Sequence, residues 1–483
     1  MPQKNSFEKT IFYAVLVTLF TLMLYLLTLA PTVLWGDDAE LQRLAILQDS
    51  GSGVRNYWLW GSIVHLFTKL PFGDLAWRVN LSSAVFAALT TGILFVIAFK
   101  ILDFPVRIAG ATSVVLAVSH TFWLHAVRAE VYTLFAFLLM GIIALLLAWH
   151  KNPSRWPLLT VSLLLTGVAL WAHLLIITFI PAVFALVIVA KKTNAKRIYL
   201  IAFVSLMVSL LPYWIANQSG ESQVNISSIL SGFFEIGARD LALWLGFLGY
   251  QFLLFTPLGV LGLMNLWQTN RALLIFLVVA FLGNIIFALS FHVPDQYVFY
   301  LPSYLIFVLW IGVGLVSVYK RFAAKQQRLL MTLFVIAVLS QIAIYRVTPM
   351  VLNQLDLNLL SVRTLPNRDN NLFFLYPPKN GYYGAQMFGE TVMESLPNNA
   401  AVLADWLPLQ TLTYFQDVEN MRQDVLLADT YVPDGQIIWL LEQSQTRPVF
   451  MADDESYYDI QEIAQKFEIT PFGPIFILER RPE

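Results

Sequence analysis

The stretch "WGDDAE", residues 35–40, places Asp37, Asp38 and Glu40 close together directly after a long apolar run. On a helix, Asp37 and Glu40 would share a face and Asp38 would point elsewhere, because residues three apart are neighbours on a helix surface. Such a group suits a general base at a membrane surface, with a neighbouring carboxylate that shapes its pKa. The alternative is structural: Asp37 or Asp38 caps a helix, and Glu40 lies in its first turn.

A second constellation is "HAVRAEVYTL", which contains His125, Arg128 and Glu130. His125 and Arg128 are candidate phosphate ligands, since the planar guanidinium group of arginine offers several donors to one anion. In the alternative interpretation, Arg128 extends to the membrane interface and pairs with Glu130.

Three further candidates lie near predicted helix ends. Asp295, in "FHVPDQYVFYLPSY", follows a proline and is either a site residue or a turn residue. His173 is either a site residue or an interfacial histidine. Arg78 is either a phosphate ligand, an arginine that reaches the interface, or the partner of Asp74 four residues earlier.

The composition indicates which elements position these residues. Hydrophobic residues make up 58% of the 483 residues, charged residues make up 13%, and the mean hydropathy is +0.66, whereas soluble domains carry about 25% charged residues. Apolar runs long enough to cross a bilayer recur along the chain, which excludes a soluble enzyme. We predict about eleven transmembrane helices. They cover residues 11–31, 81–101, 106–123, 131–149, 156–173, 174–190, 198–216, 243–267, 272–290, 300–318 and 329–345.

Basic residues predict the orientation. With the N-terminus in the cytoplasm, roughly fifteen lysines and arginines of the short loops fall inside and about six fall outside, in agreement with the positive-inside rule. The three clustered carboxylates then lie outside, at the extracytoplasmic surface. Together with the absence of cysteine, this favours a bacterial inner (plasma) membrane.

Two domains are expected. Residues 1–345 form the transmembrane domain, with a long first outer loop over about 32–80 in which "NYWLWGSIVHLFTKL" suits an interfacial or re-entrant helix. Residues 346–483 read as an extracytoplasmic soluble α/β domain. Its short apolar segments "AAVLAD", "DVLLAD", "RPVFMAD" and "IFILER" are typical of buried strands, and helical patterns lie between them.

Several motifs resemble one family. The segments "LAPTVLWGDDAEL", "LPFGDLAWRVNLSSAVFAAL", "RAEVYTL", "VPDQYVFYLPSY" and "YFQDVENMRQDVLL" are similar in order and spacing to membrane proteins related to protein O-mannosyltransferases, within the GT-C superfamily of glycosyltransferases. The signature of the first motif is A-P-T-V-x-W-G-D-x-x-E.

The resemblance implies a polytopic α-helical GT-C fold. It also implies transfer of mannose or another hexose from a polyprenyl-phosphate carrier to a hydroxyl group of a protein or glycan, at the outer surface and with inversion. Asp37 matches the acidic position that serves as general base in such enzymes. Asp38 or Glu40 would orient it, and Arg128 would bind phosphate.

One segment departs from the family pattern. Family members commonly carry H-P-P-G-Y-P-L after the acidic motif, whereas this chain reads "GSGVRNYWLW". A catalytically inactive scaffold with the same fold is therefore one alternative. A transporter or lipid flippase is another, although such proteins usually carry charges near the midplane of the membrane.

The expected ligands follow from the same reasoning. Partners are the polyprenyl-phosphate sugar, membrane lipids and the acceptor, while a net charge of −1 gives no indication of nucleic-acid binding. No cofactor is required. A divalent cation on the clustered carboxylates is an option, but no residue is assigned as a metal ligand.

Overall fold

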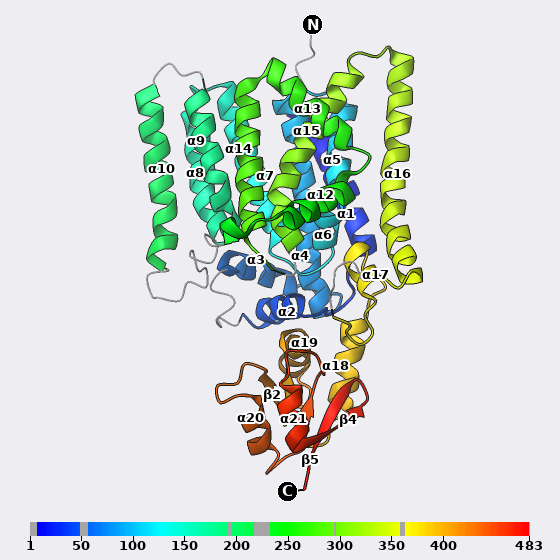
Figure 1. Cartoon of the computed structure of the whole chain (residues 1–483). Helices are drawn as coiled ribbons and strands as arrows, with labels where there is room; N and C mark the ends of the chain where they lie inside the picture. The colour runs from blue at the N-terminus through cyan, green and yellow to red at the C-terminus, as the bar shows by residue number, and fades with distance from the viewer. Residues whose placement is uncertain are drawn as a thin grey trace.

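The computed structural model describes residues 7–48, 57–190, 195–216, 232–293, 296–357 and 363–482. A bundle of long helices makes up most of the molecule, and a small domain projects from one end of it (Figure 1). The N-terminus lies at the opposite end of the bundle from this domain. The arrangement confirms the predicted class, a polytopic helical membrane protein with a C-terminal α/β domain.

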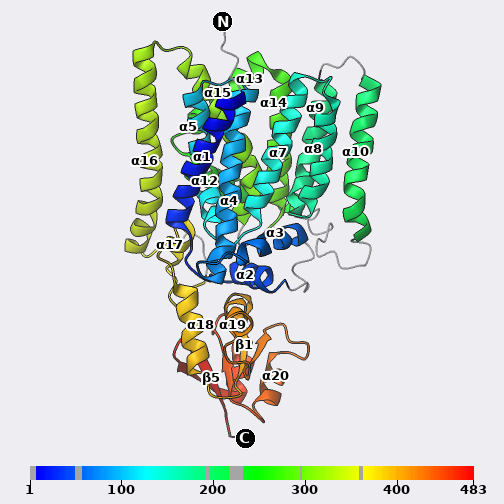
Figure 2. The ribbon, with the colours of Figure 1, turned by 180° about the vertical axis from the view of Figure 1, so that it is seen from behind.

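Within the described ranges, seven helices are long and apolar enough to cross a membrane. They are α1 (Phe7–Thr28), α4 (Leu75–Val96) continued by the π-helical turn η2 (Ile97–Ile101), α7 (Tyr132–Lys151), α10 (Ala195–Ala216), α14 (Arg271–Ser290), α15 (Leu301–Tyr319) preceded by η5 (Gln296–Tyr300), and α16 (Ala324–Gln354). In both views of the ribbon, α10 and α16 stand at opposite sides of the bundle (Figures 1 and 2).

The remaining predicted spans correspond to shorter or broken helices. Two match α8 (Trp156–Leu170) and the pair η3 (Leu174–Phe179) and α9 (Ile180–Val189). Two others, predicted as continuous over 106–123 and 243–267, are bent. The elements of these bent pairs are α5 (Val106–Ala117) with α6 (His120–Ala126), and α12 (Ala238–Phe252) with α13 (Thr256–Thr269).

The bends are 70° between α5 and α6 and 100° between α12 and α13. Extended backbone at Ser119 interrupts the first pair. In the second pair, Pro257 stands in the first turn of α13, where proline is tolerated because that N–H would have no helical partner. Hydropathy alone treats each pair as one span, because all four helices are apolar.

Two short helices cross the end of the bundle that faces the small domain. They are α2 (Asp37–Leu47) and α3 (Trp58–Thr68), and both lie between the bundle and the C-terminal domain (Figures 1 and 2). α3 matches the short Trp-rich helix predicted in the first outer loop. The candidate carboxylates therefore start a helix that is enclosed between the two parts of the molecule.

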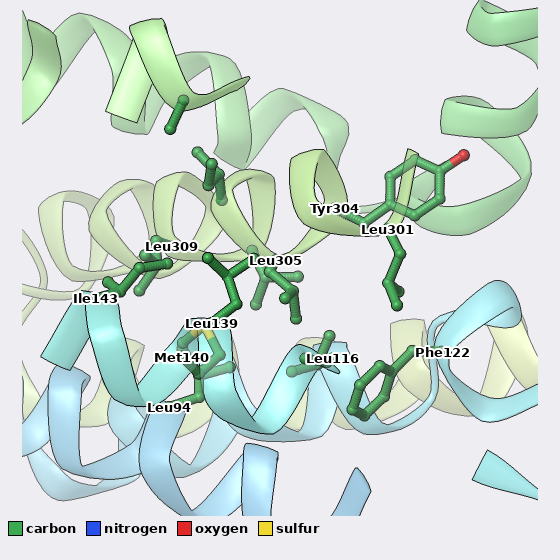
Figure 3. Close-up of a cluster of buried hydrophobic side chains, with 14 of the residues drawn as sticks. Leu94, Leu116, Phe122, Leu139, Met140, Ile143, Leu301, Tyr304, Leu305 and Leu309 are labelled. Carbon is green, nitrogen blue, oxygen red and sulfur yellow. The ribbon is translucent and has the colours of Figure 1, made fainter. Parts of the chain in front are cut away.

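The core of the bundle holds these elements in place. Leu94 of α4, Leu116 of α5, Leu139 of α7 and Leu305 of α15 are buried and point toward one another (Figure 3). Helices in lipid associate through close packing, which small residues permit. At Gly262 and Gly314, for example, an added Cβ would collide with the backbone of the facing helix.

The C-terminal domain has one five-stranded sheet with the order β2-β1-β3-β5-β4. β1 pairs in parallel with β2 and β3, and β5 pairs antiparallel with β3 and β4. The strands are β1 (Ala401–Ala404), β2 (Leu426–Asp429), β3 (Val449–Met451), β4 (Phe467–Phe472) and β5 (Ile475–Arg480). The helices are α17 (Asn370–Leu375), α18 (Gly384–Ser395), α19 (Trp406–Asp417), α20 (Gln436–Gln443) and α21 (Ile460–Lys466).

Four strands match the predicted apolar segments. β4 was not predicted, because this edge strand is largely exposed and its sequence lacks a continuous apolar run. The expected boundary at residue 345 falls within α16, which continues to Gln354.

The C-terminal domain shares a hydrophobic core with the first outer loop. Val33, Trp35 and Ala39 of the loop and α2 are buried in one cluster with Phe388 of α18 and Leu412 of α19. The Trp35 ring lies 5.0 Å from the Phe388 ring. The loop that carries the three carboxylates is therefore built jointly by the two domains.

Candidate functional site

The chain that leads into α2 is fixed to the bundle by hydrogen bonds. The Ala30 N–H donates to the Val127 carbonyl at 2.9 Å. The Gln42 amide of α2 donates to Asn80 Oδ1 of α4 at 2.8 Å, and Asn80 Nδ2 donates to the Ala30 carbonyl at 3.1 Å. All these groups are buried. Because buried amides are costly to leave without partners, they hold the start of α2 in one position.

Helix α2 begins at Asp37, with Gly36 as its N-cap residue. No side chain caps this end. The interpretation of Asp37 or Asp38 as a capping residue is therefore wrong, because both lie one residue too late, inside the first turn. Gly36 has φ +60°, and an added Cβ would collide with Leu407 of α19, so glycine suits both the backbone and the packing.

The three carboxylates of α2 point to different partners. Asp37 is exposed, and its Oδ1 accepts a hydrogen bond of 2.7 Å from the Trp406 indole of α19. Asp38 is buried, and its Oδ1 lies 3.6 Å from Arg128 Nε. Glu40 is half-buried, one turn from Asp37. The predicted separation of Asp38 from the Asp37 face agrees with this geometry.

Arg128 is the centre of a buried ionic cluster. Its Nη2 donates to Glu130 Oε1 at 2.5 Å, and His125 Nδ1 lies 3.3 Å from the same oxygen. The backbone of Glu130 is also held, since its carbonyl accepts from the Trp60 indole at 3.1 Å and its N–H donates to Ser83 Oγ at 3.2 Å. The structure thus brings together residues from α2, α6 and the turn before α7.

Aromatic rings pack against His125 of this cluster. The rings of Tyr297 and His125 stack with centroids 6.1 Å apart, and the Tyr132 ring lies 5.3 Å from the His125 ring. Tyr132 also lies 5.1 Å from His173. His173 is therefore one ring removed from the ionic cluster, and its Nδ1 accepts a hydrogen bond from the Leu175 N–H at 3.1 Å. Asp295 lies outside the described residues.

Arg78 and Asp74 have structural roles near the start of α4. The Arg78 guanidinium donates to the Thr68 carbonyl at 2.8 Å and to the Gly73 carbonyl at 2.9 Å. Asp74 caps α4 by accepting from the Ala76 N–H at 2.8 Å. The structure does not bring Arg78 to the cluster around Arg128. Instead, the hydrogen bonds of Arg78 stabilise the loop between α3 and α4.

A second cation reaches the cluster from the C-terminal part of the chain. Lys379 is 1% exposed. Its backbone N–H donates to the Thr28 carbonyl at the end of α1, and its Nζ donates to the Tyr376 carbonyl at 2.5 Å. The charges of Asp38 and Arg128 both act on its ammonium group. The sequence analysis missed Lys379, because its stretch "YPPKNGYYG" has no nearby residue that indicates a partner.

The carboxyl groups of the site also differ in the direction and cause of their pKa shifts. Burial raises the pKa of Asp38 well above its usual range, although Arg128 opposes this effect. Burial also favours the neutral form of Glu130, but the closer contact with Arg128 and the charge of His125 lower the pKa of Glu130 to about 2. Desolvation raises the pKa of Asp37, and the hydrogen bond from Trp406 lowers it. Burial, followed by the charge of Asp37, raises the pKa of Glu40 to about 7.

A metal ion does not fit the three carboxylates as they stand. Asp37 and Asp38 already have Trp406 and Arg128 as partners, and their side chains diverge. Among the described residues, no group of three or more histidine, aspartate or glutamate side chains is arranged to hold a metal ion.

A comparison with family models found one match. Residues 57–196 match the family described as "Protein O-mannosyl-transferase TMEM260 N-terminal domain". The segment includes α3, α4 and the turn with Arg128 and Glu130. A search of curated proteins gave no match.

Solved structures share the fold at low sequence identity. The chain is similar to ArnT from Cupriavidus metallidurans bound to undecaprenyl phosphate, with a TM-score of 0.56 and 12% identity over 96% of this chain and 97% of the other. ArnT from the same organism in the apo state has a TM-score of 0.55 and 14% identity, over 96% of this chain and 97% of the other. The Archaeoglobus fulgidus oligosaccharyltransferase, in complex with Zn and sulfate, has a TM-score of 0.53 and 12% identity. The similarity covers 91% of this chain and 68% of the other.

These findings confirm the resemblance that the motifs predicted. This chain is an integral membrane protein that shares the fold of these GT-C membrane proteins, and its residues 57–196 are similar to the N-terminal domain of protein O-mannosyltransferase TMEM260.

Proposed function

We propose that the protein is an inverting glycosyltransferase, which moves a sugar from a polyprenyl-phosphate carrier to a hydroxyl group of an acceptor. The observation that carries this proposal is the arrangement of Asp37 and Arg128. An exposed carboxylate begins α2, and the next residue, Asp38, lies 3.6 Å from a buried guanidinium group. A base that water and acceptor can reach therefore lies next to a cationic site that is shielded from water.

Asp37 has the position of a general base. In the proposed reaction, the acceptor oxygen attacks the anomeric carbon while its proton passes to the Asp37 carboxylate. The bond between the anomeric carbon and the phosphate oxygen breaks, and the phosphate keeps the electron pair. One displacement of this kind inverts the anomeric centre. The hydrogen bond from Trp406 to Oδ1 leaves Oδ2 of Asp37 for the proton.

Arg128 and Lys379 are the proposed phosphate ligands. The leaving phosphate gains negative charge, and cations fixed in a low-dielectric site stabilise that charge more than cations in water would. Arg128 is held in place by Glu130 and Asp38, so its orientation does not depend on the substrate. Burial lowers the pKa of Lys379, and an incoming phosphate would favour its charged form.

The carrier and the location are part of the proposal. ArnT, whose fold this chain shares, is described in complex with undecaprenyl phosphate, which supports a polyprenyl-phosphate donor. The distribution of basic residues among the loops supports a site at the extracytoplasmic surface, where a lipid-borne donor and a water-borne acceptor would meet. Absence of cysteine favours a bacterial inner membrane.

A transfer assay with Asp37→Asn tests this function. The wild type and the variant, reconstituted in lipid, are incubated with radiolabelled polyprenyl-phosphate sugars, including mannose, and with a membrane extract as acceptor source. Asp103→Asn is the matched control, because Asp103 is exposed in the turn between η2 and α5, beside Lys151.

We expect label to move to the extract with the wild type and Asp103→Asn and not with Asp37→Asn. Equal transfer by Asp37→Asn would show that Asp37 is not the base. Absence of transfer by the wild type with every donor would contradict the transferase and favour a scaffold or a transporter.

A further inference from the structure

The carboxyl edge of the C-terminal sheet carries exposed aromatic residues. Since β1, β2 and β3 are parallel, their carboxyl ends lie at one edge, where ligands of such sheets usually bind. Trp406 follows β1, Tyr431 follows β2 and Tyr457 follows β3, and they are 41%, 88% and 55% exposed. Because Ala404 pairs with Asp429, Trp406 and Tyr431 occupy equivalent positions beyond their strands.

Trp406 and Tyr457 belong to one continuous surface. The Tyr457 ring lies 5.4 Å from the Arg363 guanidinium carbon. Arg363 Nη2 is 2.7 Å from Asp405 Oδ2, and the Tyr458 hydroxyl donates to Asp405 Oδ1 at 2.9 Å. Asp405 directly precedes Trp406. This ionic pair, whose side chains are 7% and 8% exposed, fixes the spacing of the two rings.

This surface reaches the proposed base. The Trp406 indole donates to Asp37 Oδ1 at 2.7 Å, so a hydroxyl group within hydrogen-bond distance of the other Asp37 oxygen must lie beside the indole. The remainder of any acceptor would then extend along the edge, toward Tyr457 or Tyr431.

The chemistry of the edge suits a carbohydrate. The C–H face of a sugar ring is apolar and packs on an aromatic ring, while the hydroxyl groups around its rim donate to carboxylates. Carboxylates accompany the aromatic residues here. Asp429 ends β2, and its Oδ1 accepts a hydrogen bond from the Tyr431 N–H at 2.9 Å; Asp453 follows β3, and its Oδ2 lies 3.2 Å from Arg363 Nη1. Asp454 is exposed, so the surface combines apolar ring faces with a carboxylate that solvent reaches.

Other classes of acceptor fit less well. A peptide that adds to a sheet needs the free side of a strand, and the carboxyl edge presents strand ends. Clustered carboxylates repel an anionic lipid headgroup. An aliphatic chain would favour a continuous apolar patch, and the carboxylates interrupt this one.

We propose that the carboxyl edge of the C-terminal sheet is the acceptor subsite, that its ligand is a glycan chain, and that one sugar ring of the acceptor packs on Trp406. The proposal rests on the proposed function, because it narrows the acceptor of that reaction from any hydroxyl compound to a carbohydrate.

Binding of oligosaccharides without any donor tests this inference. The full chain is purified in a detergent that lacks a sugar headgroup. Saturation-transfer NMR then measures binding of linear hexasaccharides of mannose, glucose and N-acetylglucosamine, and of a serine- and threonine-rich peptide. The variants are Trp406→Ala, Trp406→Phe and Tyr457→Ala. Tyr383→Ala is the control, because Tyr383 is 47% exposed and belongs to the start of α18, which does not follow β1, β2 or β3 in the chain.

We expect at least one hexasaccharide to bind the wild type and Tyr383→Ala equally. Trp406→Ala and Tyr457→Ala should weaken this binding about tenfold or more, as the loss of an aromatic contact residue does at other binding sites. Trp406→Phe keeps a ring and should retain most of the binding, which separates loss of the ring from misfolding.

Three results would overturn the proposal: no hexasaccharide binds the wild type, the affinity of Trp406→Ala is unchanged, or only the peptide binds. Because the measurement contains no donor, its failure is distinct from a failure of transfer. A wild type that binds the hexasaccharide and transfers no sugar would refute the transferase and leave the carbohydrate site standing.

Discussion

Asp37 and Asp38 are neighbours in the sequence, but the fold gives them opposite environments. Asp37 faces solvent and a tryptophan of the C-terminal domain, whereas Asp38 is buried beside Arg128. This difference separates a carboxylate that can exchange protons with an acceptor from one that holds a cation. In a flexible loop, both carboxylates would be exposed to solvent and would have the same chemical role.

Arg128 should be essential for stability as well as for transfer. Arg128→Ala leaves Glu130 and Asp38 buried without their cation, and removal of one partner from a buried ion pair costs about 3–5 kcal/mol. We expect a large fall in the free energy of unfolding, measured by thermal or denaturant unfolding in detergent. Arg271→Ala, a change at an exposed arginine, should alter it by about 0.5 kcal/mol or less. Equal effects would contradict a buried ionic cluster.

Glu40 should make stability depend on pH. Its pKa is raised to about 7 from its usual 4.5, so the folded chain binds the Glu40 proton more tightly than the unfolded chain does. Stability contributed by this group is therefore lost as the pH rises from about 4.5 to 7. We expect the melting temperature of the wild type to fall more than that of Glu40→Gln between about pH 5 and about pH 8. Parallel curves for the two proteins would show that Glu40 has an ordinary pKa.

At the scale of elements, the first turn of α2 and the start of α19 form one unit. Gly36 packs against Leu407, Asp37 bonds Trp406, and Arg43 Nη1 lies 3.1 Å from Asp417 Oδ2. Contacts with both ends of α19 therefore hold α2 in place. A change that separates these helices should disturb Asp37 without touching its side chain.

Gly36→Ala should abolish transfer. Its φ of +60° and ψ of −124° lie in a region that L-residues rarely adopt, so alanine costs about 1–3 kcal/mol there. The new Cβ would also collide with Leu407. Gly435→Ala is the control, since Gly435 also has a positive φ, +86°, but no neighbouring atom lies within 4 Å of an added Cβ. We expect Gly435→Ala to lose stability and keep transfer. Partial recovery of transfer by Gly36→Ala combined with Leu407→Ala would confirm that the collision matters, and full transfer by Gly36→Ala alone would refute the close packing.

The sequence predicted elements better than contacts. Long apolar runs located the helices, because lipid demands about 20 apolar residues per crossing, but about eleven spans were too many. Among the described residues, seven helices are long and apolar enough to cross a membrane, or up to nine if each bent pair is one span, and the spans predicted over 156–173 and 174–190 are shorter helices. The bends at Ser119 and at Pro257 escaped this reasoning, since a broken helix and a straight one can have the same hydropathy. Asp37, Arg128 and Glu130 were predicted as candidates from their residue types, and the structure brings Arg128 and Glu130 together beside Asp38. Lys379 and Trp406 were missed, because their importance depends on contacts with residues hundreds of positions away.

At the scale of the whole molecule, the site lies between a membrane bundle and a soluble domain (Figure 1). In the proposed reaction, the lipid-borne donor would meet Arg128 from the side of the bundle, and the glycan would meet Asp37 from the side of the C-terminal sheet. A site built from both parts of the molecule needs them fixed to each other, and the core shared by the C-terminal domain and the loop after α1 provides this. A domain attached only by a linker could not hold Trp406 against Asp37.

The orientation of this assembly can be tested because the chain has no cysteine. Ser456 is exposed on the C-terminal domain and Ser154 is exposed in the turn between α7 and α8. The orientation predicted from the basic loops puts Ser154 in the cytoplasm and Ser456 outside. In intact cells, a membrane-impermeant maleimide should therefore label Ser456→Cys at once and Ser154→Cys only after permeabilisation. The opposite pattern would place Asp37 on the cytoplasmic side, where the proposed donor and acceptor would have to be found instead. Because serine and cysteine are similar in size, neither exposed change should disturb the fold, so the two labelling rates report sidedness directly.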